Sequence, residues 1–250
     1  MKELGASLGT ANPRILEDPG RRNGNAAHVP PLLEAEGLTK RWQRGRLTVL
    51  EATDLALEPG TVVSVFGANG SGKTTLLRIL AGLILPDAGV VRLDGLDPHR
   101  DRVEYQRRIG FLSAGYGGMY ARLTVRRQLA FWARIAFVPG ARRAQACDEA
   151  MARFDLFELA GRRLDRLSMG QRQCVRLAMA FLHHPDVVLL DEPWNSLDEE
   201  GEHLLAATLI ELRNRGGSAI CCTPTGGELS RNVPNVDRAL RLEGGSLHPV

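Results

Sequence analysis

The sequence predicts an α/β fold built on a mainly parallel sheet, and three observations support this prediction. Short apolar runs such as Thr61–Phe66 and Val187–Leu190 are compact enough to be strands that are buried on both faces. Longer segments with helical periodicity alternate with these runs, as in other α/β domains. Turn signals such as Pro59–Gly60 separate the segments. The chain of 250 residues is long enough for one large domain or two small ones.

In the first half of the chain, each expected element ends at a recognisable stop signal. Val49–Leu57 is strand-like and stops at the proline–glycine turn, and the β-branched run Thr61–Phe66 follows it. A glycine-rich loop then leads into a helix over Lys73–Ala81, which ends at a glycine. Two further strands are expected at Val90–Leu93 and Ile109–Leu112.

The middle of the chain is mostly helical in pattern. We expect helices there at Arg102–Arg108, Val125–Phe137, Ala141–Phe154 and Gly170–Leu182. The last part returns to alternation, with a strand at Val187–Leu190, a helix at about Glu199–Arg213, and strands at Ser218–Cys222 and near Ala239–Leu242. The sequence therefore predicts a helical subdomain, at about residues 101–180, inserted into the α/β core.

Composition excludes several classes of protein. No apolar run approaches 18 residues, so no membrane-spanning helix is expected, and residues 1–31 predict a disordered tail without a secretory signal. The four cysteines lack metal-ligand spacing and indicate a reduced, cytosolic setting. Residues 92–176 are strongly basic and residues 177–250 acidic, which suits either an anionic partner, pairing of two copies, or a solvated arginine-rich surface.

A phosphate-binding loop is the strongest motif. The segment Gly67–Thr74 fits the pattern G-x-x-x-x-G-K-[ST], between an expected strand and an expected helix. Backbone N–H groups in such a loop bind phosphate at a helix N-terminus. Lys73 is expected to reach the β- and γ-phosphates of a nucleotide, and the Thr74 hydroxyl is expected to bind Mg²⁺. A glycine-rich strand–helix turn without a ligand is the competing interpretation.

A buried strand that ends in two carboxylates supports this motif. The run Val187–Leu190 is followed by Asp191 and Glu192. The carboxyl ends of parallel strands lie at the ligand crevice, so we expect Asp191 to hold Mg²⁺ and Glu192 to polarise an attacking water. An acidic turn at a strand end is the alternative interpretation of the pair considered alone.

Together with the pentapeptide Leu167–Gln171, these motifs resemble the ATP-binding subunits of ABC transporters. That family has L-S-G-G-Q where this chain has Leu-Ser-Met-Gly-Gln, and Asn195–Asp198 is similar to its D-loop. The resemblance covers residues 32–250. It implies a P-loop NTPase core with an N-terminal antiparallel β part and an inserted helical subdomain. It also implies ATP and Mg²⁺ as cofactors.

The resemblance implies a set of site residues. Catalysis would rest on Glu192 and Lys73, and metal binding on Thr74 and Asp191. Nucleotide binding would use Trp42, Gly67, Ala68, Asn69, Gly70, Ser71, Gly72, Lys73, Thr74, Thr75, Ser168, Gly170 and Gln171. Trp42 stands where the family places an aromatic that stacks on adenine, although packing on its own strand is also compatible with its neighbours. The Ser168 segment is also compatible with an ordinary N-capped helix.

Besides Met169, the chain departs from the family pattern at three further positions. Ala114 occupies the position of a glutamine that senses Mg²⁺ and the attacking water, and Pro224 that of a switch histidine. Neither side chain can donate a hydrogen bond. Arg127 replaces a glutamate that often closes a capping box, in the region where the resemblance places contact with a membrane subunit.

These observations predict an ATP-hydrolysing subunit that energises a membrane transporter. The resemblance implies two subunits paired head to tail, as a homodimer or heterodimer, and bound to a separate membrane-spanning subunit at the inner face of the cell membrane. The glycine-rich segment Ser113–Tyr120 resembles that of exporter-type subunits of the family, which implies an exporter. A hydrolysis-poor regulatory half of a heterodimer, and a soluble ABC ATPase acting on ribosomes or DNA, are the alternatives. We expect no nucleic-acid partner.

Overall fold

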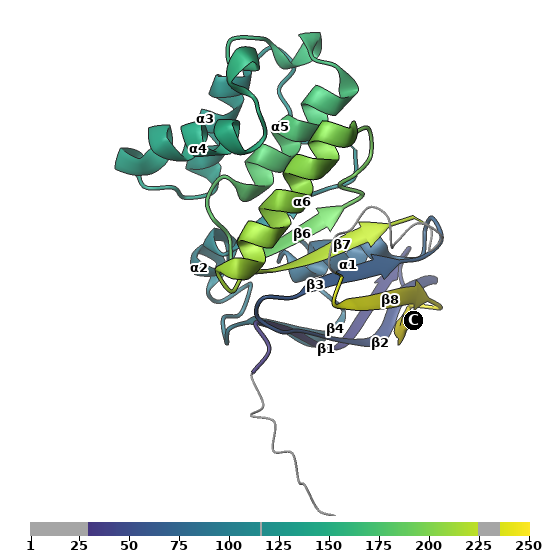
Figure 1. Ribbon diagram of the computed structural model, residues 1–250. Helices are drawn as coiled ribbons and strands as arrows, with labels where there is room; N and C mark the ends of the chain where they lie inside the picture. The colour runs from purple at the N-terminus through teal and green to yellow at the C-terminus, as the bar shows by residue number, and fades with distance from the viewer. Residues whose placement is uncertain (1–29, 116, 225–235) are drawn as a thin grey trace, which may run out of the picture.

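The computed structural model describes residues 30–115, 117–224 and 236–250, and it contains two sheets (Figure 1). The larger sheet has the strand order β5-β6-β7-β3-β8-β9 and the smaller one the order β2-β1-β4. The larger sheet consists of β5 (Ile109–Leu112), β6 (Val187–Asp191), β7 (Ser218–Thr223), β3 (Val62–Phe66), β8 (Arg238–Glu243) and β9 (Ser246–Pro249). The smaller sheet consists of β2 (Leu47–Leu57), β1 (Leu33–Trp42) and β4 (Ala88–Leu93). The α/β prediction is confirmed.

Five strands of the larger sheet run parallel, and their register aligns the segments that carry the predicted site. β3 pairs with β7 and β8, and β6 pairs with β5 and β7. Asp191 of β6, Cys222 of β7 and Val65 of β3 form one row across the sheet. The segments that follow these three strands therefore leave the sheet at the same edge, where parallel α/β sheets bind their ligands.

Hydrophobic cores cover both faces of the larger sheet. Val188 and Leu190 belong to one core cluster, whereas Val187 and Leu189 belong to the other, as the alternation of side chains along a strand requires. The first cluster includes residues of α3 (Val125–Ile135), α4 (Arg143–Arg153), α5 (Met169–Phe181) and α6 (Glu199–Asn214). The second includes α1 (Lys73–Leu80), α2 (Arg102–Arg107) and the smaller sheet. Both faces of β6 are thus sealed from water.

The helices α3 and α4 lie at one end of the molecule, and the smaller sheet lies at the other (Figure 1). Within residues 101–180, expected to be a helical insertion, the structure places β5 beside β6 in the larger sheet. Three short 3₁₀ turns connect the helices of this part, at Gly140–Arg142, Phe157–Leu159 and Leu164–Arg166. The expected helix at Ala141–Phe154 therefore begins as a 3₁₀ turn and becomes α-helical at Arg143.

The C-terminal hairpin joins the two sheets. β8 and β9 pair antiparallel, and the Gly245 carbonyl in their connecting turn accepts hydrogen bonds from Thr53 Oγ1 at 2.6 Å and from the Glu51 N–H at 2.9 Å. Both donors lie on β2. The sequence patterns identified neither β1 nor β9, which lack a clear apolar run. The expected tail lies almost wholly outside the described residues, of which no helix is long and apolar enough to cross a membrane.

Candidate functional site

Lys73 lies across the loop that joins β3 to α1. Its Nζ donates to the carbonyl oxygens of Gly67 at 2.7 Å and of Ala68 at 2.9 Å, and the residue is 6% exposed. The N–H of Ser71 donates to the same Ala68 carbonyl at 3.1 Å, which closes a turn. An ammonium has three donors, and loop carbonyls occupy two of them. The positive charge is therefore fixed within the loop, close to the first turn of α1.

The loop is packed tightly against β2. Gly72 caps α1 with a φ of 109°, a backbone conformation that residues with a Cβ rarely adopt. A Cβ placed there would meet Val49 Cγ1 at 2.8 Å and the Val49 carbonyl oxygen at 2.9 Å. Thus glycine is required at this position by both conformation and space. Of the other loop residues, Ala68, Asn69 and Gly70 are exposed.

Thr74 and Asp191 bring the loop and the acidic strand end together. Thr74 Oγ1 donates to Asp191 Oδ2 at 2.7 Å, and the Ala114 N–H donates to the same carboxylate oxygen at 3.3 Å. Asp191 is 2% exposed. Thr75, which follows in α1, is half-buried. Thr74 and Asp191, which were each expected to bind Mg²⁺, therefore lie within hydrogen-bond distance of one another.

Glu192 is held by its backbone and by its side chain. Its N–H donates to the Cys222 carbonyl at 2.9 Å, and its Oε2 accepts from Asn195 Nδ2 at 2.5 Å. Its φ of 52° lies in the left-handed region, which is uncommon for a residue with a side chain. In the neighbouring strand, Thr223 Oγ1 is buried without a hydrogen-bond partner among the described residues. Thr223 pairs in register with Phe66, directly before the loop.

These groups fit a bound Mg²⁺–nucleotide. Ser71 Oγ is buried, and no hydrogen-bond partner for it lies in the described part of the chain, so it is available to a ligand oxygen. The N–H groups at the start of α1 and the Lys73 ammonium suit an anion. Thr74 Oγ1 and Asp191 Oδ2 are oxygen ligands of the kind that Mg²⁺ prefers. We infer that the loop is chemically suited to phosphate, and the Thr74–Asp191 pair to the metal.

The pentapeptide Leu167–Gln171, which we call the signature segment, leads into the start of α5 as expected. Ser168 and Gln171 form a capping box, with Gln171 N–H to Ser168 Oγ at 3.1 Å and Ser168 N–H to Gln171 Oε1 at 3.1 Å. A Cβ on Gly170 would approach the Ser196 carbonyl oxygen to 2.8 Å, so glycine allows α5 to pack on the segment after Glu192. No hydrogen bond among the described residues joins this helix start to the phosphate loop.

Trp42 lies at the end of β1, where its residue pairs in register with Leu47. It is 41% exposed, and Lys40 Nζ lies 4.9 Å from the centre of its ring. Val49, two positions further along β2, is the residue that packs on Gly72. Trp42 is therefore presented to solvent at the end of a hairpin that contacts the phosphate loop.

Sequence reasoning assigned no role at the site to three polar side chains that lie next to it. Asn195 contacts Glu192. The buried side chains of Gln173 and Arg176 contact the backbone carbonyls of Pro193 and Ser113, respectively. A signal for the α5 pair was present, because Gln173 and Arg176 are polar residues spaced i, i+3 on an apolar helix face. The Asn195 contact depends on the turn after β6, which the sequence pattern did not specify.

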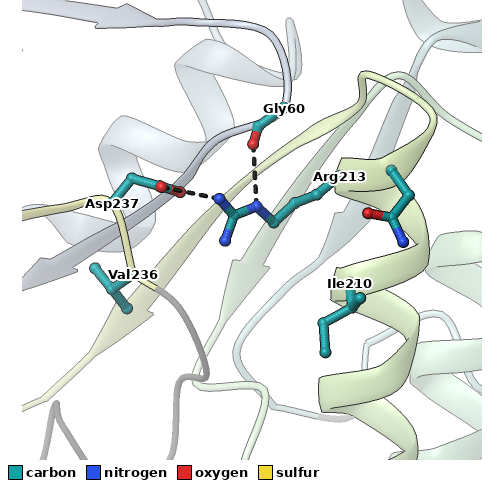
Figure 2. A pocket seen from close by; sticks show the side chains of 6 residues that line it. Gly60, Ile210, Arg213, Val236 and Asp237 are labelled. Atoms are coloured by element: carbon teal, nitrogen blue, oxygen red, sulfur yellow. Dashed lines mark hydrogen bonds and ion pairs between the residues drawn. The ribbon is translucent and has the colours of Figure 1, made fainter.

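A pocket also lies at the opposite ends of the parallel strands, away from the phosphate loop. It measures about 600 Å³ and is lined by residues that precede β3 and β8 and by the end of α6. Figure 2 shows Arg213 between Gly60 and Asp237, and the side chain donates to the Gly60 carbonyl at 3.1 Å and to Asp237 Oδ1 at 2.9 Å. Asp237 Oδ2 in turn accepts from the Val62 N–H at 2.8 Å. These contacts attach α6 to the sheet.

Comparison with known proteins identifies the family. A family model described as ABC transporter matches residues 50–195, which is more than half of the chain. The chain belongs to the ABC transporter ATP-binding family. The matched segment contains the phosphate loop, the signature and the acidic strand end, which are the motifs that carried the resemblance.

Curated members of the ABC family are similar to this chain. It is 33% identical over 177 residues to the ABC transporter ATP-binding protein NatA of Bacillus subtilis, covering 70% of this chain and 72% of NatA. It is 39% identical over 160 residues to the sulfate/thiosulfate import ATP-binding protein CysA of Gloeobacter violaceus, covering 64% of this chain and 46% of CysA. It is 31% identical over 221 residues to the lipoprotein-releasing system ATP-binding protein LolD of Bacteroides fragilis, covering 86% of this chain and all of LolD.

Solved structures of ABC proteins share the fold. The ATP-binding subunit of an ABC transporter superposes with a TM-score of 0.77 at 24% identity, covering 86% of this chain and 88% of the other. A dimeric ATP-binding cassette in a post-hydrolysis state, bound to ADP and Pi, superposes with a TM-score of 0.74 at 24% identity, covering 86% of this chain and 96% of the other. The predicted P-loop NTPase fold of the ABC family is thus confirmed.

Proposed function

We propose that this chain is an ATP-hydrolysing subunit that energises a membrane transporter. The observation that carries the proposal is the 2.7 Å hydrogen bond from Thr74 Oγ1 to Asp191 Oδ2. This bond brings the phosphate loop against the acidic strand end, so that phosphate-binding and metal-binding groups lie together. The family membership supports the same conclusion.

Each residue of the site has a role in this proposal. The loop N–H groups, Ser71 and Lys73 bind the phosphates, and Thr74 with Asp191 would hold Mg²⁺, which neutralises charge on the phosphate oxygens when bound. Glu192 orients the attacking water and accepts its proton. The water oxygen bonds to the γ-phosphorus as the bond to the β–γ bridging oxygen breaks, so the products are ADP and phosphate.

The remaining predicted residues act from outside the loop. Trp42 stacks on the adenine ring, because it is an exposed aromatic on the hairpin that packs against Gly72. Ser168, Gly170 and Gln171 begin α5, and in a head-to-tail dimer this helix start closes the nucleotide of the second subunit. The dimeric state of a structural relative bound to ADP and Pi supports this arrangement.

A groove next to the site supports a membrane-spanning partner. It has a volume of about 230 Å³ between the end of α1, β5, α3 and α5, and its lining includes Leu83, Phe111, Trp132 and Ile135. Leu83 is 50% and Ile135 is 44% exposed, which leaves apolar surface for a partner to cover. In this proposal the membrane-spanning subunit binds the groove at the inner face of the cell membrane, and the chain acts from the cytoplasm as an exporter subunit.

Steady-state phosphate release from the purified chain tests the proposal. Turnover is expected to require Mg²⁺ and to be lost in Lys73→Ala and Asp191→Asn, because the first variant lacks the phosphate-binding charge and the second weakens the metal site. Arg78→Ala, which removes an exposed cation from the same helix as Lys73, is the matched control and should retain turnover. Unchanged ATP affinity of Lys73→Ala in calorimetry at matched salt would refute the phosphate-loop assignment.

A second function has one specific observation in its favour. Ala114 offers Asp191 only a backbone N–H, and Pro224 follows Thr223 without a side-chain donor. A chain that binds ATP but hydrolyses it slowly fits the regulatory half of a heterodimer. The same assay separates the two functions, since the regulatory half would bind ATP in calorimetry and release phosphate only when a second ATPase subunit is added.

A further inference from the structure

Two buried polar side chains of α5 connect the segments on either side of the acidic strand end. Arg176 donates to the Ser113 carbonyl through one guanidinium nitrogen and to Gln173 Oε1 at 2.5 Å through another. Gln173 Nε2 donates to the Pro193 carbonyl at 2.7 Å. Arg176 is 7% exposed and Gln173 is 2% exposed. We call the chain of contacts Ser113–Arg176–Gln173–Pro193 the α5 bridge.

The α5 bridge completes a closed ring of contacts that passes through Asp191 and Glu192. Ser113 directly precedes Ala114, whose N–H donates to Asp191 Oδ2. Pro193 directly follows Glu192. The bridge therefore ties the segment that contacts Asp191 to the residue that follows Glu192, and it does so through one helix. Because hydrogen bonds to a buried guanidinium are strong and costly to lose, the ring resists displacement of either segment.

The α5 bridge matters because position 114 lacks the side-chain hydrogen-bond donor that the family pattern leads us to expect. Alanine contributes no side-chain hydrogen bond there, so its backbone N–H makes the contact with Asp191. The position of that N–H depends on the Ser113 carbonyl in the preceding residue, which Arg176 binds. Arg176 also lines the groove described above, together with Ser113. The guanidinium thus touches both the groove and the segment that contacts Asp191.

We propose that Arg176 is a positioning residue, which fixes the Ala114 N–H against Asp191 and, through Gln173, the segment after Glu192. The proposal rests on the proposed ATPase function and goes beyond it, because it assigns the alignment of the site to a guanidinium on α5. In this arrangement a partner segment in the groove contacts Arg176 and thereby acts on the geometry at Asp191 and Glu192. The side chain itself does not touch substrate.

The test compares Arg176→Gln, Arg176→Lys and Gln173→Ala with Arg172→Gln in the full-length chain. Arg172 lies on the same helix and donates to the Leu164 and Asp165 carbonyls, outside the bridge, so it is a matched control. The first readout is amide hydrogen exchange of residues 113–114 in protein without nucleotide. The second is steady-state phosphate release, with the apparent KM for ATP and the Mg²⁺ concentration that gives half-maximal rate.

We expect Arg176→Gln to speed exchange at Ala114 by about tenfold or more, since losing the contact at the Ser113 carbonyl frees the peptide group that carries the Ala114 N–H. We expect kcat to fall on the order of 10- to 100-fold with KM for ATP unchanged within about twofold, because misplacement affects the reacting geometry more than binding. Arg176→Lys should restore part of the loss. Gln173→Ala should reproduce the loss of kcat. The double variant Arg176→Gln/Gln173→Ala should be no worse than either single variant.

Equal exchange rates at residues 113–114 in Arg176→Gln and Arg172→Gln would overturn the proposal, whatever the rate of turnover. If Arg176→Gln does not fold, the same comparison with Gln173→Ala decides. The proposed function fails separately, when the parent chain neither binds nor hydrolyses Mg²⁺–ATP. If the parent hydrolyses ATP and kcat is the same in Arg176→Gln and Arg172→Gln, only the positioning role is wrong.

Discussion

Asn195 Nδ2 donates a hydrogen bond to Glu192 Oε2 at 2.5 Å, across a tight turn that the Asn195 N–H closes on the Glu192 carbonyl at 3.2 Å. Glu192 adopts its left-handed backbone conformation within this turn, at a cost on the order of 1 kcal/mol. The side-chain bond gives the carboxylate a fixed orientation. In the proposed mechanism, this bond would align Glu192 with the attacking water.

Asn195→Ala removes this hydrogen bond and leaves the Glu192 carboxylate free to rotate. We expect kcat to fall by about tenfold with little change in KM for ATP, because orientation affects the chemical step more than binding. Steady-state phosphate release measures both constants. Asn214→Ala, at the exposed end of α6, is the control. A kcat equal to that of the parent would show that the bond does not align the carboxylate.

Glu192→Gln keeps the shape of the side chain but removes its ability to accept a proton. We expect this variant to bind ATP without turnover and to accumulate as a dimer closed by the start of α5 from the second subunit. Sedimentation velocity with ATP and Mg²⁺ measures the dimer. A variant that is monomeric while ATP is demonstrably bound contradicts a stable homodimer and favours a heteromeric partner.

Ala114→Gln and Pro224→His each introduce a side-chain donor that the resemblance leads us to expect. One positioned donor typically changes a rate on the order of 10²–10³-fold, so we expect the parent to turn over slowly and the double variant to be at least tenfold faster. The measurement is phosphate release from each single variant and from the double variant.

Thr223→Val tests whether the parent uses a substitute for these donors. Thr223 Oγ1 is buried without a partner in the described residues, and Thr223 pairs with Phe66 just before the phosphate loop. If Thr223 substitutes for the missing donor, Thr223→Val lowers phosphate release by about tenfold or more. A parent that is fast and that tolerates this change controls its chemistry elsewhere. Thr225, a second hydroxyl residue that follows Pro224 and could supply a donor, lies outside the described residues.

His183 makes the stability of the fold depend on pH. Burial lowers the pKa of its imidazole to about 4, and its Nε2 lies 3.0 Å from the Ile109 carbonyl oxygen. Between about pH 6.5 and pH 4 the unfolded chain binds a proton that the folded chain does not, so stability falls as pH decreases through this range. We expect a loss on the order of 3 kcal/mol from this group.

Urea unfolding across this pH range measures the effect. His183→Gln retains a donor for the Ile109 carbonyl and does not titrate, so its stability should depend less on pH than that of the parent. His184→Gln is the matched control, because His184 pairs with Glu149 at the surface, at 2.8 Å. Parallel pH curves for the parent and His183→Gln would contradict the assignment.

The sequence predicted those parts of the fold whose local pattern agrees with their environment. β3, β6 and β7 are runs of apolar residues buried on both faces, and each was expected within a residue or two. β1 and β9 were not identified, although each forms a hairpin with its neighbour in the chain, because exposed and half-buried positions leave both without a clear apolar run. β1 also pairs with β4, which lies much further along the chain, and no local pattern encodes that pairing.

The candidate site shows the same division. The loop, Thr74 and Asp191 could be predicted because the residues that bind phosphate and metal must occur at fixed spacing after a strand. The spacing of Gln173 and Arg176 marks them as unusual, but their contacts could not be predicted, because the Ser113 and Pro193 carbonyls that they bind lie far away in the sequence. Backbone acceptors carry no sequence signal. The Asn195 contact likewise depends on a left-handed turn at a glutamate.

The position of β3 in the sheet has a consequence for synthesis on the ribosome. β3 pairs only with β7 and β8, and the Thr61 N–H before it donates to Ser218 Oγ, 157 positions later in the chain. At roughly 5–20 residues per second, the ribosome needs on the order of 10–30 s to make the strands that complete this sheet. During that interval the smaller sheet and α1 can form, but β3, which leads into the phosphate loop, still lacks its partner strands β7 and β8. We therefore expect nucleotide to stabilise this protein only after β7 and β8 have left the exit tunnel and paired with β3.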